Sequence, residues 1–335
     1  MPLEAALPLG AVRLPLSWRV PLLHLGLAWL GLGALFLADW SAMTHQWWNA
    51  STYNHILLVP PILAWLVGIR APALAKLAPH AWWPGLGLLA AGLLAWLVGT
   101  ATGVNLVSQL GAVVVLQAAV VTLLGPRVAA GLLFPLGYML FLVPFGDEIV
   151  PMLQAITAKL AVGLTHASGV PAQVEGVFID TPAGLFEVAE ACSGVKFLVA
   201  MVALGSLAAH LGFKGWKRRA VFMAAAIVVP VLANGVRAWG TIYIAQSQGI
   251  AFAAGFDHIV YGWIFFVVVM GVLLAAAWRF FDRAPDDPLV DAAALEASPA
   301  LSRASRYRIG GRTALAALLM GSGAAVLMDR IAGLP

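Results

Sequence analysis

Stretches of apolar residues long enough to cross a lipid bilayer recur along the whole sequence and restrict the chain to a membrane-spanning fold. Runs of about spanning length, roughly 20 residues, begin near Pro21, His55, Trp82, Val104, Val128, Ser193, Ala220 and Ile259, and a shorter ninth begins near Thr313. Because a backbone exposed to lipid must satisfy its own hydrogen bonds, each run is expected to be an α-helix. We therefore predict an all-α polytopic membrane protein with about eight transmembrane helices. The ninth run is either one more span or a marginal apolar segment.

Composition supports a membrane protein and excludes several function classes. Hydrophobic residues make up 62% of the chain and charged residues 10%. The only cysteine, Cys192, cannot form an internal disulfide and excludes a cysteine-rich metal site. The net charge of +4 would suit an anionic partner, but its distribution along the chain is more informative than its sum. No motif points to a metal, a nucleotide or a nucleic acid, so we expect no cofactor, no metal and no nucleic-acid partner.

The basic residues set the expected orientation. With the N-terminus in the cytoplasm, 15 of the 19 Lys and Arg residues fall on cytoplasmic loops or on the segment 284–312. The exceptions are Lys159, Lys196, Arg237 and Arg330. Cytoplasmic loops of membrane proteins carry an excess of Lys and Arg, so this asymmetry predicts which side faces inward.

The same topology divides the chain into four parts. Residues 1–20 form a cytoplasmic N-terminal segment, and residues 21–283 form a transmembrane core that contains a periplasmic insert at 145–191. Residues 284–312, rich in Asp, Pro, Ala and Arg, are predicted to be a solvated cytoplasmic linker. Residues 313–335 form a C-terminal hydrophobic segment.

Two patterns in the insert predict local structure. Apolar residues at near-helical spacing from Val150 to Leu164 predict an amphipathic helix that lies in the membrane interface. Residues 174–188 read as two short extended pieces around Thr181-Pro182-Ala183-Gly184, which predicts a hairpin. Such a hairpin is either a docking edge for an extended peptide or a structural cap over the helices.

Three reactive residue types are predicted to meet at the outer membrane boundary. Cys192 opens the sixth run from outside, Arg237 lies near the outer end of the seventh, and His258 opens the eighth from outside. Consecutive helices joined by short loops tend to pack side by side. A thiolate is the nucleophilic form of cysteine, a guanidinium stabilises an oxyanion, and an imidazole transfers protons. We therefore predict an acyl-transfer site with these three residues as its catalytic groups.

Each of these residues also has a plainer interpretation. A lone cysteine in a membrane helix is usually an inert small hydrophobe, and an arginine near the end of a span can extend its charge to the interface. His258 at a helix mouth can be an interfacial residue. His55, beside Tyr53, is the second candidate for the base, and an interfacial anchor is equally expected there. His45 and His166 also face outward in this topology.

Neighbouring residues are predicted to support the site. Ser193 follows the cysteine at the start of a helix, whose N-terminus favours a negative charge. Glu187 and Glu190 would be three residues apart on a helix and would then be candidate partners for Arg237. Asp257 is a candidate for orienting the histidine that follows it, although adjacent residues on a helix do not share a face.

Several sequence blocks together resemble those of the exosortases, a family of multi-spanning bacterial membrane proteins. The blocks are Glu190-Ala191-Cys192-Ser193-Gly194, Asn234-Gly235-Val236-Arg237, His258-Ile259-Val260-Tyr261-Gly262-Trp263 and, earlier in the chain, Tyr53-Asn54-His55 with Pro60-Pro61. The likeness covers about residues 20 to 283. It matches Cys192, Arg237 and His258 to the proposed catalytic positions of that family, and it adds Asn234 and Tyr261 as supporting or substrate-binding positions.

The resemblance implies a cysteine transpeptidase in the bacterial inner membrane, with several spans and an active site that faces the periplasm. Its substrates would be secreted proteins with a C-terminal Pro-Glu-Pro signal, a hydrophobic helix and a basic tail. The other expected partners are membrane lipids and an unidentified lipid or polysaccharide acceptor. Two other classes stay open: a non-enzymatic polytopic component of exopolysaccharide export, and a cysteine-dependent lipid acyltransferase or intramembrane protease that uses the same residues.

Overall fold

The computed structural model describes residues 15–250, 253, 262–284 and 287–333, and nearly all of its regular structure is helical. The internal contacts divide the chain into two compact units. Unit 1 comprises residues 1–144 and 288–335, and unit 2 comprises residues 145–287. The boundary after residue 144 coincides with the start of the predicted insert at residue 145, although the prediction kept residues 21–283 in one core. Each unit is described by itself.

Within the described residues, seven helices are long and apolar enough to cross a membrane, or up to eight if one bent pair counts as a span. Four of the seven lie in unit 1: α1 (Leu16–Leu35), α5 (Gly85–Thr102), α6 (Asn105–Gly131) and α15 (Gly311–Ala332). The helical segments in unit 2 extend over Asp147–Ala167, Glu190–Gly212 and Trp216–Gln248. The prediction of an all-α polytopic membrane protein is thus confirmed, with the small sheet of the insert as its β-structure. The ninth run is helical over 22 residues.

Neither of two predicted runs is one continuous α-helix of spanning length. The run that begins near His55 contains most of the 3-10 helix η2 (Asn54–Leu58) and then α3 (Val59–Gly68), and the segment Asn54–Gly68 is bent by 109° relative to α2 (Leu37–Asn49), which precedes it. The run that begins near Val128 follows a break in α6 at Gly125, whose φ is 83°. It contains the end of α6, then α7 (Leu133–Tyr138) and the 3-10 helix η3 (Met139–Leu142). Each of the two was predicted as a single spanning helix, and that part of the prediction is wrong.

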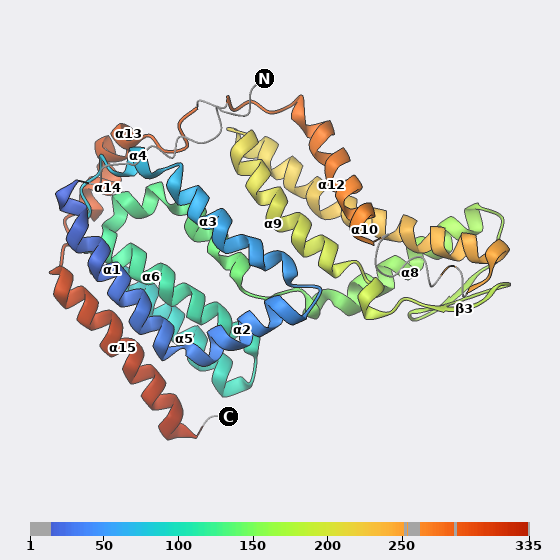
Figure 1. The fold of residues 1–335 in the computed structure, drawn as a ribbon, viewed down its shortest axis with the longest axis horizontal. Helices are drawn as coiled ribbons and strands as arrows, with labels where there is room; N and C mark the ends of the chain where they lie inside the picture. Colours follow the sequence, from blue (N-terminus) through green and yellow to red (C-terminus); the bar gives the residue numbers. More distant parts are fainter. Residues whose placement is uncertain (1–14, 251–252, 254–261, 285–286, 334–335) are drawn as a thin grey trace. The chain divides into compact units, whose positions relative to one another are not determined.

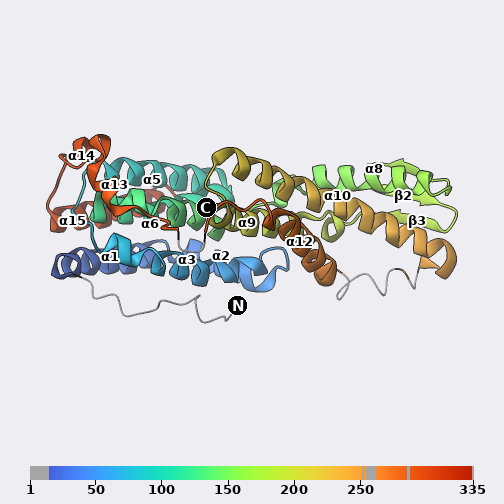
Figure 2. The ribbon, with the colours of Figure 1, turned by 90° about the horizontal axis from the view of Figure 1, so that it is seen from above.

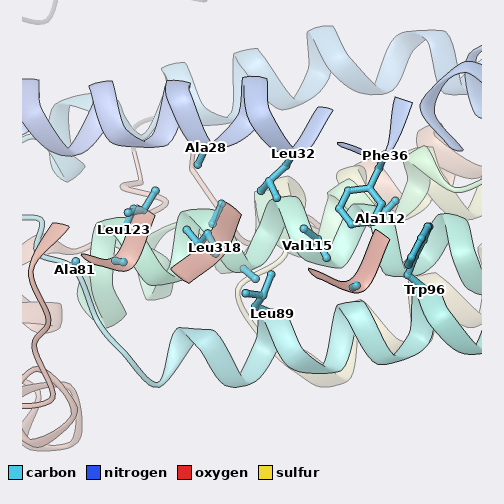
Figure 3. Packing of buried hydrophobic residues seen from close by; sticks show 14 residues of the cluster. Ala28, Leu32, Phe36, Ala81, Leu89, Trp96, Ala112, Val115, Leu123 and Leu318 are labelled. Atoms are coloured by element: carbon cyan, nitrogen blue, oxygen red, sulfur yellow. The ribbon is translucent and has the colours of Figure 1, made fainter. Parts of the chain in front are cut away.

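The core of unit 1 lies between α1, α5, α6 and α15. Figure 3 shows Leu32, Leu89, Val115 and Leu318, one from each helix, gathered in this core. α5 and α6 approach each other so closely that a Cβ atom on Gly111 would lie 2.5 Å from the Trp96 nitrogen. Small residues therefore set the distance between these two helices.

Residues 284–312 were predicted to be a solvated linker, and most of the described residues in this segment are exposed, although it also forms short helices that contact the rest of unit 1. It contains α13 (Ala292–Ala297) and α14 (Pro299–Ala304), and both helices contact α6. Val290 and Leu295 join an apolar cluster with Leu74, which belongs to the short helix α4 (Ala71–Leu74), and with Val128. The few apolar residues of the segment are enough to hold it against the ends of the long helices.

Unit 2 is organised around one long helix, α10 (Trp216–Gln248). Its 33 residues correspond to about 50 Å at 1.5 Å per residue, which exceeds the roughly 30 Å thickness of a bilayer core. The first part of α10 packs against α9 (Val195–Gly212) and α12 (Gly262–Trp278). In Figures 1 and 2, α10 then continues beyond α9 and lies beside α8 (Val150–Ala167), which follows the 3-10 helix η4 (Asp147–Ile149).

The predicted insert helix is α8, and its partner is the later part of α10. Asn234 of α10 bonds to Thr157, and the Trp239 indole donates to the Ser168 hydroxyl at 2.9 Å. On both helices the residue of the second contact comes later in the sequence than the residue of the first. α8 and α10 therefore run in the same direction. The helix is confirmed; its placement in the membrane interface stays a prediction.

The insert also holds a three-stranded antiparallel sheet in the order β1 (Gln173–Glu175), β2 (Phe178–Thr181) and β3 (Gly184–Glu187). The predicted hairpin is confirmed as β2 and β3, which turn at Pro182-Ala183. The first predicted piece is two strands rather than one, because Gly176 turns the chain at φ 60°. Ile179 of β2 is buried in a cluster with Ala158 of α8 and Ile242 of α10, so one face of the sheet covers these helices.

We expect Gly111→Ala to destabilise the protein, because the new methyl group forces α5 and α6 apart. Overpacking of this kind costs about 1–3 kcal/mol. Gly87→Ala is the control: Gly87 lies on α5 with no atom within 4 Å of its Cβ position, and alanine favours a helix by about 0.5–1 kcal/mol. Thermal unfolding of both variants in one detergent checks this. A Gly111→Ala protein as stable as the parent would contradict the close packing.

Candidate active site around Cys192

Cys192 lies in a short turn that leads into α9. It ends the 3-10 helix η5 (Glu190–Cys192), and α9 begins three residues later, after Gly194 turns the chain at φ 86°. The hydroxyl of Ser193 accepts a bond from the Val195 amide at 3.3 Å, which satisfies one of the free amides at the start of the helix. The thiol is partly buried and packs in the cluster that also contains Ala238 of α10.

Asn234 connects this turn to the two neighbouring helices. Its amide nitrogen donates to the Cys192 carbonyl at 2.9 Å and to the Thr157 hydroxyl at 3.0 Å. Its amide oxygen accepts from two nitrogens of Arg237, Nε at 3.3 Å and Nη2 at 3.2 Å. Only 2% of Asn234 is exposed, so these bonds are shielded from water. One side chain therefore orients the segment that carries the cysteine and the guanidinium.

Arg237 is a buried cation with an exposed fraction of 9%. Besides Asn234 it contacts the aromatic face of Phe197, with its Cζ atom 6.0 Å from the ring centroid. The Lys196 ammonium lies 5.2 Å from the same centroid. Cations are attracted to aromatic faces at such distances, so Phe197 helps to hold two positive charges near the start of α9.

The first turns of α12 also reach this end of the bundle. Phe266 stacks on Phe197, with the ring centroids 5.5 Å apart and the planes at 16°. Phe266 belongs to the second turn of α12, which starts at Gly262. His258 precedes Gly262 by only four residues in the sequence. The described part of α12 thus begins beside the residues that hold Arg237.

The arrangement has the chemical character of a site for developing negative charge. A guanidinium and an ammonium lie near the turn of a partly buried thiol, and positive groups favour both a thiolate and an oxyanion. Within the described residues, no group of three or more His, Cys, Asp and Glu side chains is placed to hold a metal ion.

The structure brings together four of the predicted site residues, Cys192, Ser193, Asn234 and Arg237. Ser193 is 2% exposed, and its carbonyl accepts a bond from the Thr157 hydroxyl at 3.4 Å. The prediction for the two glutamates is wrong in its premise, because Glu187 lies in β3 and not in a helix with Glu190. Glu190 is exposed, whereas Arg237 is buried.

Five other predicted residues either fall outside the described residues or belong to unit 1. Asp257, His258 and Tyr261 fall outside the described residues, and their roles stay predictions. Tyr53 and His55 belong to unit 1, where Tyr53 is buried and the His55 Nδ1 lies 3.0 Å from the Thr52 carbonyl. Their part in the site also stays a prediction.

Two other histidines, His166 and His45, were left as possible bases by the predicted topology. The His166 ring lies 2.6 Å from the Ala172 carbonyl, at the end of α8. It is nine residues beyond Thr157, or about 14 Å along the helix. His45 is exposed on α2 in unit 1. His166 therefore holds the start of the sheet rather than the turn of Cys192.

Sequence reasoning missed three residues that build the site. Thr157 and Phe197 contact the network directly, and Gln154 donates to the Val188 carbonyl at 2.7 Å, which fixes the chain shortly before Cys192. Gln154 and Thr157 share one face of α8, three residues apart among apolar neighbours. This pair of polar residues on a mainly apolar helix was the available signal.

Comparison with known proteins gives one match. The sequence matches the family model of transmembrane exosortases over residues 47–275, which is more than half of the chain. No match was found among curated proteins or among solved structures. The matched region contains the whole network from Thr157 to Arg237.

We expect Gly194→Ala to disturb the site as well as the fold. Its new Cβ atom would lie 2.7 Å from the Asn234 Cγ, in addition to the roughly 1–2 kcal/mol cost of a left-handed backbone without glycine. Gly169→Ala is the control, since its φ of 80° carries the same cost with no atom within 4 Å. Thermal unfolding and the alkylation rate of Cys192 measure the difference. Equal destabilisation with unchanged alkylation in both variants would argue against a role for the Gly194 contact.

Proposed function

Because the chain belongs to the transmembrane exosortase family, we propose that it is a membrane-embedded cysteine transpeptidase of protein sorting. The substrate is a secreted protein that carries a C-terminal sorting signal followed by a hydrophobic helix and a basic tail. The observation that supports this best is the Asn234 side chain, which bonds to the Cys192 carbonyl and to the Arg237 guanidinium at once. The turn of the proposed nucleophile and a positively charged side chain are thus linked by one buried amide.

The proposed reaction begins with attack of the Cys192 thiolate on a peptide carbonyl carbon. A C–S bond forms, and the carbonyl oxygen becomes an oxyanion that Arg237 stabilises. The C–N bond then breaks, and His258 gives a proton to the departing amine, which leaves with the membrane anchor. The acyl group remains on the cysteine as a thioester.

The thioester is resolved by a second nucleophile. An acceptor amine or hydroxyl attacks the thioester carbonyl, His258 takes its proton, and the thiolate leaves. If water attacks instead, the product is a free carboxylate and the reaction is hydrolysis. The same residues would serve a lipid acyltransferase, and mass spectrometry of the new C-terminus of a processed substrate separates these outcomes.

The proposed site faces the periplasm of a bacterial inner membrane. The turn between α9 and α10 and the start of α10 carry Lys214, Lys217, Arg218 and Arg219. Cys192 lies at the opposite end of α9, whose 18 residues correspond to about 27 Å. The excess of Lys and Arg on cytoplasmic loops supports placing the basic turn inside and the cysteine outside.

We expect Cys192→Ala to abolish processing of a substrate with an intact sorting signal. The thiol is the proposed nucleophile, and its removal leaves no group to form the thioester. Substrate cleavage is followed by the mass shift that marks loss of the hydrophobic tail. Protein abundance and thermal stability are expected to stay at parental values, because the small thiol is only partly buried. Unchanged cleavage in a folded Cys192→Ala protein would remove the cysteine from the mechanism.

We expect Arg237→Gln to lower the cleavage rate by roughly 10²-fold, the usual cost of losing an oxyanion-stabilising donor. Arg237→Lys keeps the charge but not the forked contact with Asn234, so its rate should lie between those of Arg237→Gln and the parent. Single-turnover cleavage rates compare the three proteins. Equal rates for the two variants would indicate that the charge does not contribute.

A further inference from the structure

We propose that one end of unit 1 binds the phosphate of an anionic membrane lipid. This inference does not depend on the proposed reaction, because it concerns residues 80–83, 122–127 and 302–309 of unit 1. The residues from 302 onward lie outside the region that matches the exosortase family.

Three segments meet there in an extended arrangement. The backbone of residues 80–82 bonds to the end of α6 on one side, through His80 N to Leu124 O at 3.4 Å and Trp82 N to Thr122 O at 2.7 Å. On the other side, Trp83 N donates to Tyr307 O at 3.2 Å and Ile309 N to Ala81 O at 3.1 Å. The Trp82 indole also donates to the Ala304 carbonyl at 2.8 Å. The residues after α14 are thus fixed beside the break in α6.

This junction gathers positive charge. His80, Arg127 and Arg308 come from the three different segments, and Arg303 and Arg306 lie nearby in sequence. The pKa of the His80 imidazole is lowered from its ordinary value, first by burial and also by the Arg308 and Arg127 guanidinium groups, against the opposing effect of the Ala78 carbonyl. Both guanidinium groups therefore lie near the His80 ring.

Buried polar atoms of the junction lack a hydrogen-bond partner. Within the described residues these include Nε2 of His80, Nε of Arg127 and Oγ of Ser305. Arg127 uses its Nη2 for the Ser302 hydroxyl at 3.1 Å, and Arg308 uses its Nε for the Ser305 carbonyl at 3.2 Å. Leaving a buried polar group unsatisfied is unfavourable. Phosphate oxygens are acceptors of the kind that guanidinium and imidazole donors require, and the negative charge of the phosphate would pair with the Arg127 and Arg308 guanidinium groups.

The aromatic residues beside the cations favour a lipid as the source of the phosphate. Trp83 and Tyr307 form an edge-to-face pair with ring centroids 6.0 Å apart, and they are 51% and 55% exposed. Exposed Trp and Tyr residues are typical of the headgroup level of a bilayer. Basic pockets at the cytoplasmic ends of membrane helices bind anionic headgroups in the same way.

The test uses the full-length protein in detergent, titrated with phosphatidylglycerol, phosphatidylcholine or inorganic phosphate, with the thermal unfolding midpoint as the measurement. We expect phosphatidylglycerol to raise the midpoint of the parent protein more than the other two ligands. In the double variant Arg127→Gln with Arg308→Gln, the apparent Kd for phosphatidylglycerol should rise about 30-fold. This value assumes that each lost basic residue weakens binding by about 1 kcal/mol and that about 1.4 kcal/mol corresponds to a tenfold change in Kd.

The matched control, Lys217→Gln with Arg279→Gln, removes two exposed charges outside the junction. Its apparent Kd for phosphatidylglycerol should stay within about twofold of the parent value. Equal losses in the two double variants, or equal binding of phosphatidylcholine, would overturn the proposal. Binding of inorganic phosphate as tightly as phosphatidylglycerol would overturn the lipid as the source.

If the glutamine variant melts before ligand is added, Arg127→Lys with Arg308→Lys replaces it. This variant keeps both charges, so phosphatidylglycerol should still raise its thermal unfolding midpoint. A folded lysine variant whose midpoint no longer responds to the lipid would contradict the site.

Discussion

The candidate site depends on the buried side-chain amide of Asn234. Its nitrogen donates to Cys192 and Thr157, and its oxygen accepts from Arg237. A buried amide is costly unless its donors and its acceptor are used, and here both ends are used. The three segments it joins are otherwise held mainly by apolar contacts, which are not directional. The amide supplies the direction, because it fixes which turn of α10 faces the Cys192 turn.

The length of α10 makes this network possible. The helix belongs to the bundle through its contacts with α9 and α12, and to the insert through its contacts with α8 and the sheet. Gln246, near its end, donates to the Thr181 hydroxyl of β2 at 3.2 Å. The insert is thereby tied to the same rigid element that carries Asn234 and Arg237. One face of the sheet is used for this attachment, so its buried side serves as a cap, and docking of a peptide along a sheet edge stays a prediction.

The sequence predicts the helices well because lipid leaves a backbone few alternatives. It also predicts the order of the site segments, since Cys192 and Arg237 stand at the ends of consecutive apolar runs. It does not predict the division into two units or the packing of residues 290–304, because these depend on contacts between distant segments such as Val290 and Val128. Glu187 illustrates the same limit: its spacing from Glu190 suits a helix, but pairing with Phe178 holds it in a strand. Thr157 was missed because a hydroxyl in a helix usually bonds to its own backbone.

An amide suits position 234 better than a carboxylate for the proposed chemistry. A carboxylate would accept from Arg237 as well, but it has no proton to donate to the Cys192 carbonyl, so the turn would lose its bond to α10. It would also place a negative charge against the guanidinium, in a buried site where such an interaction is strong. The guanidinium would then stabilise that carboxylate in the resting state rather than an oxyanion that appears only during reaction. An amide orients the cation and leaves its charge uncancelled by residue 234, which is the condition under which a positive group accelerates a reaction that develops negative charge.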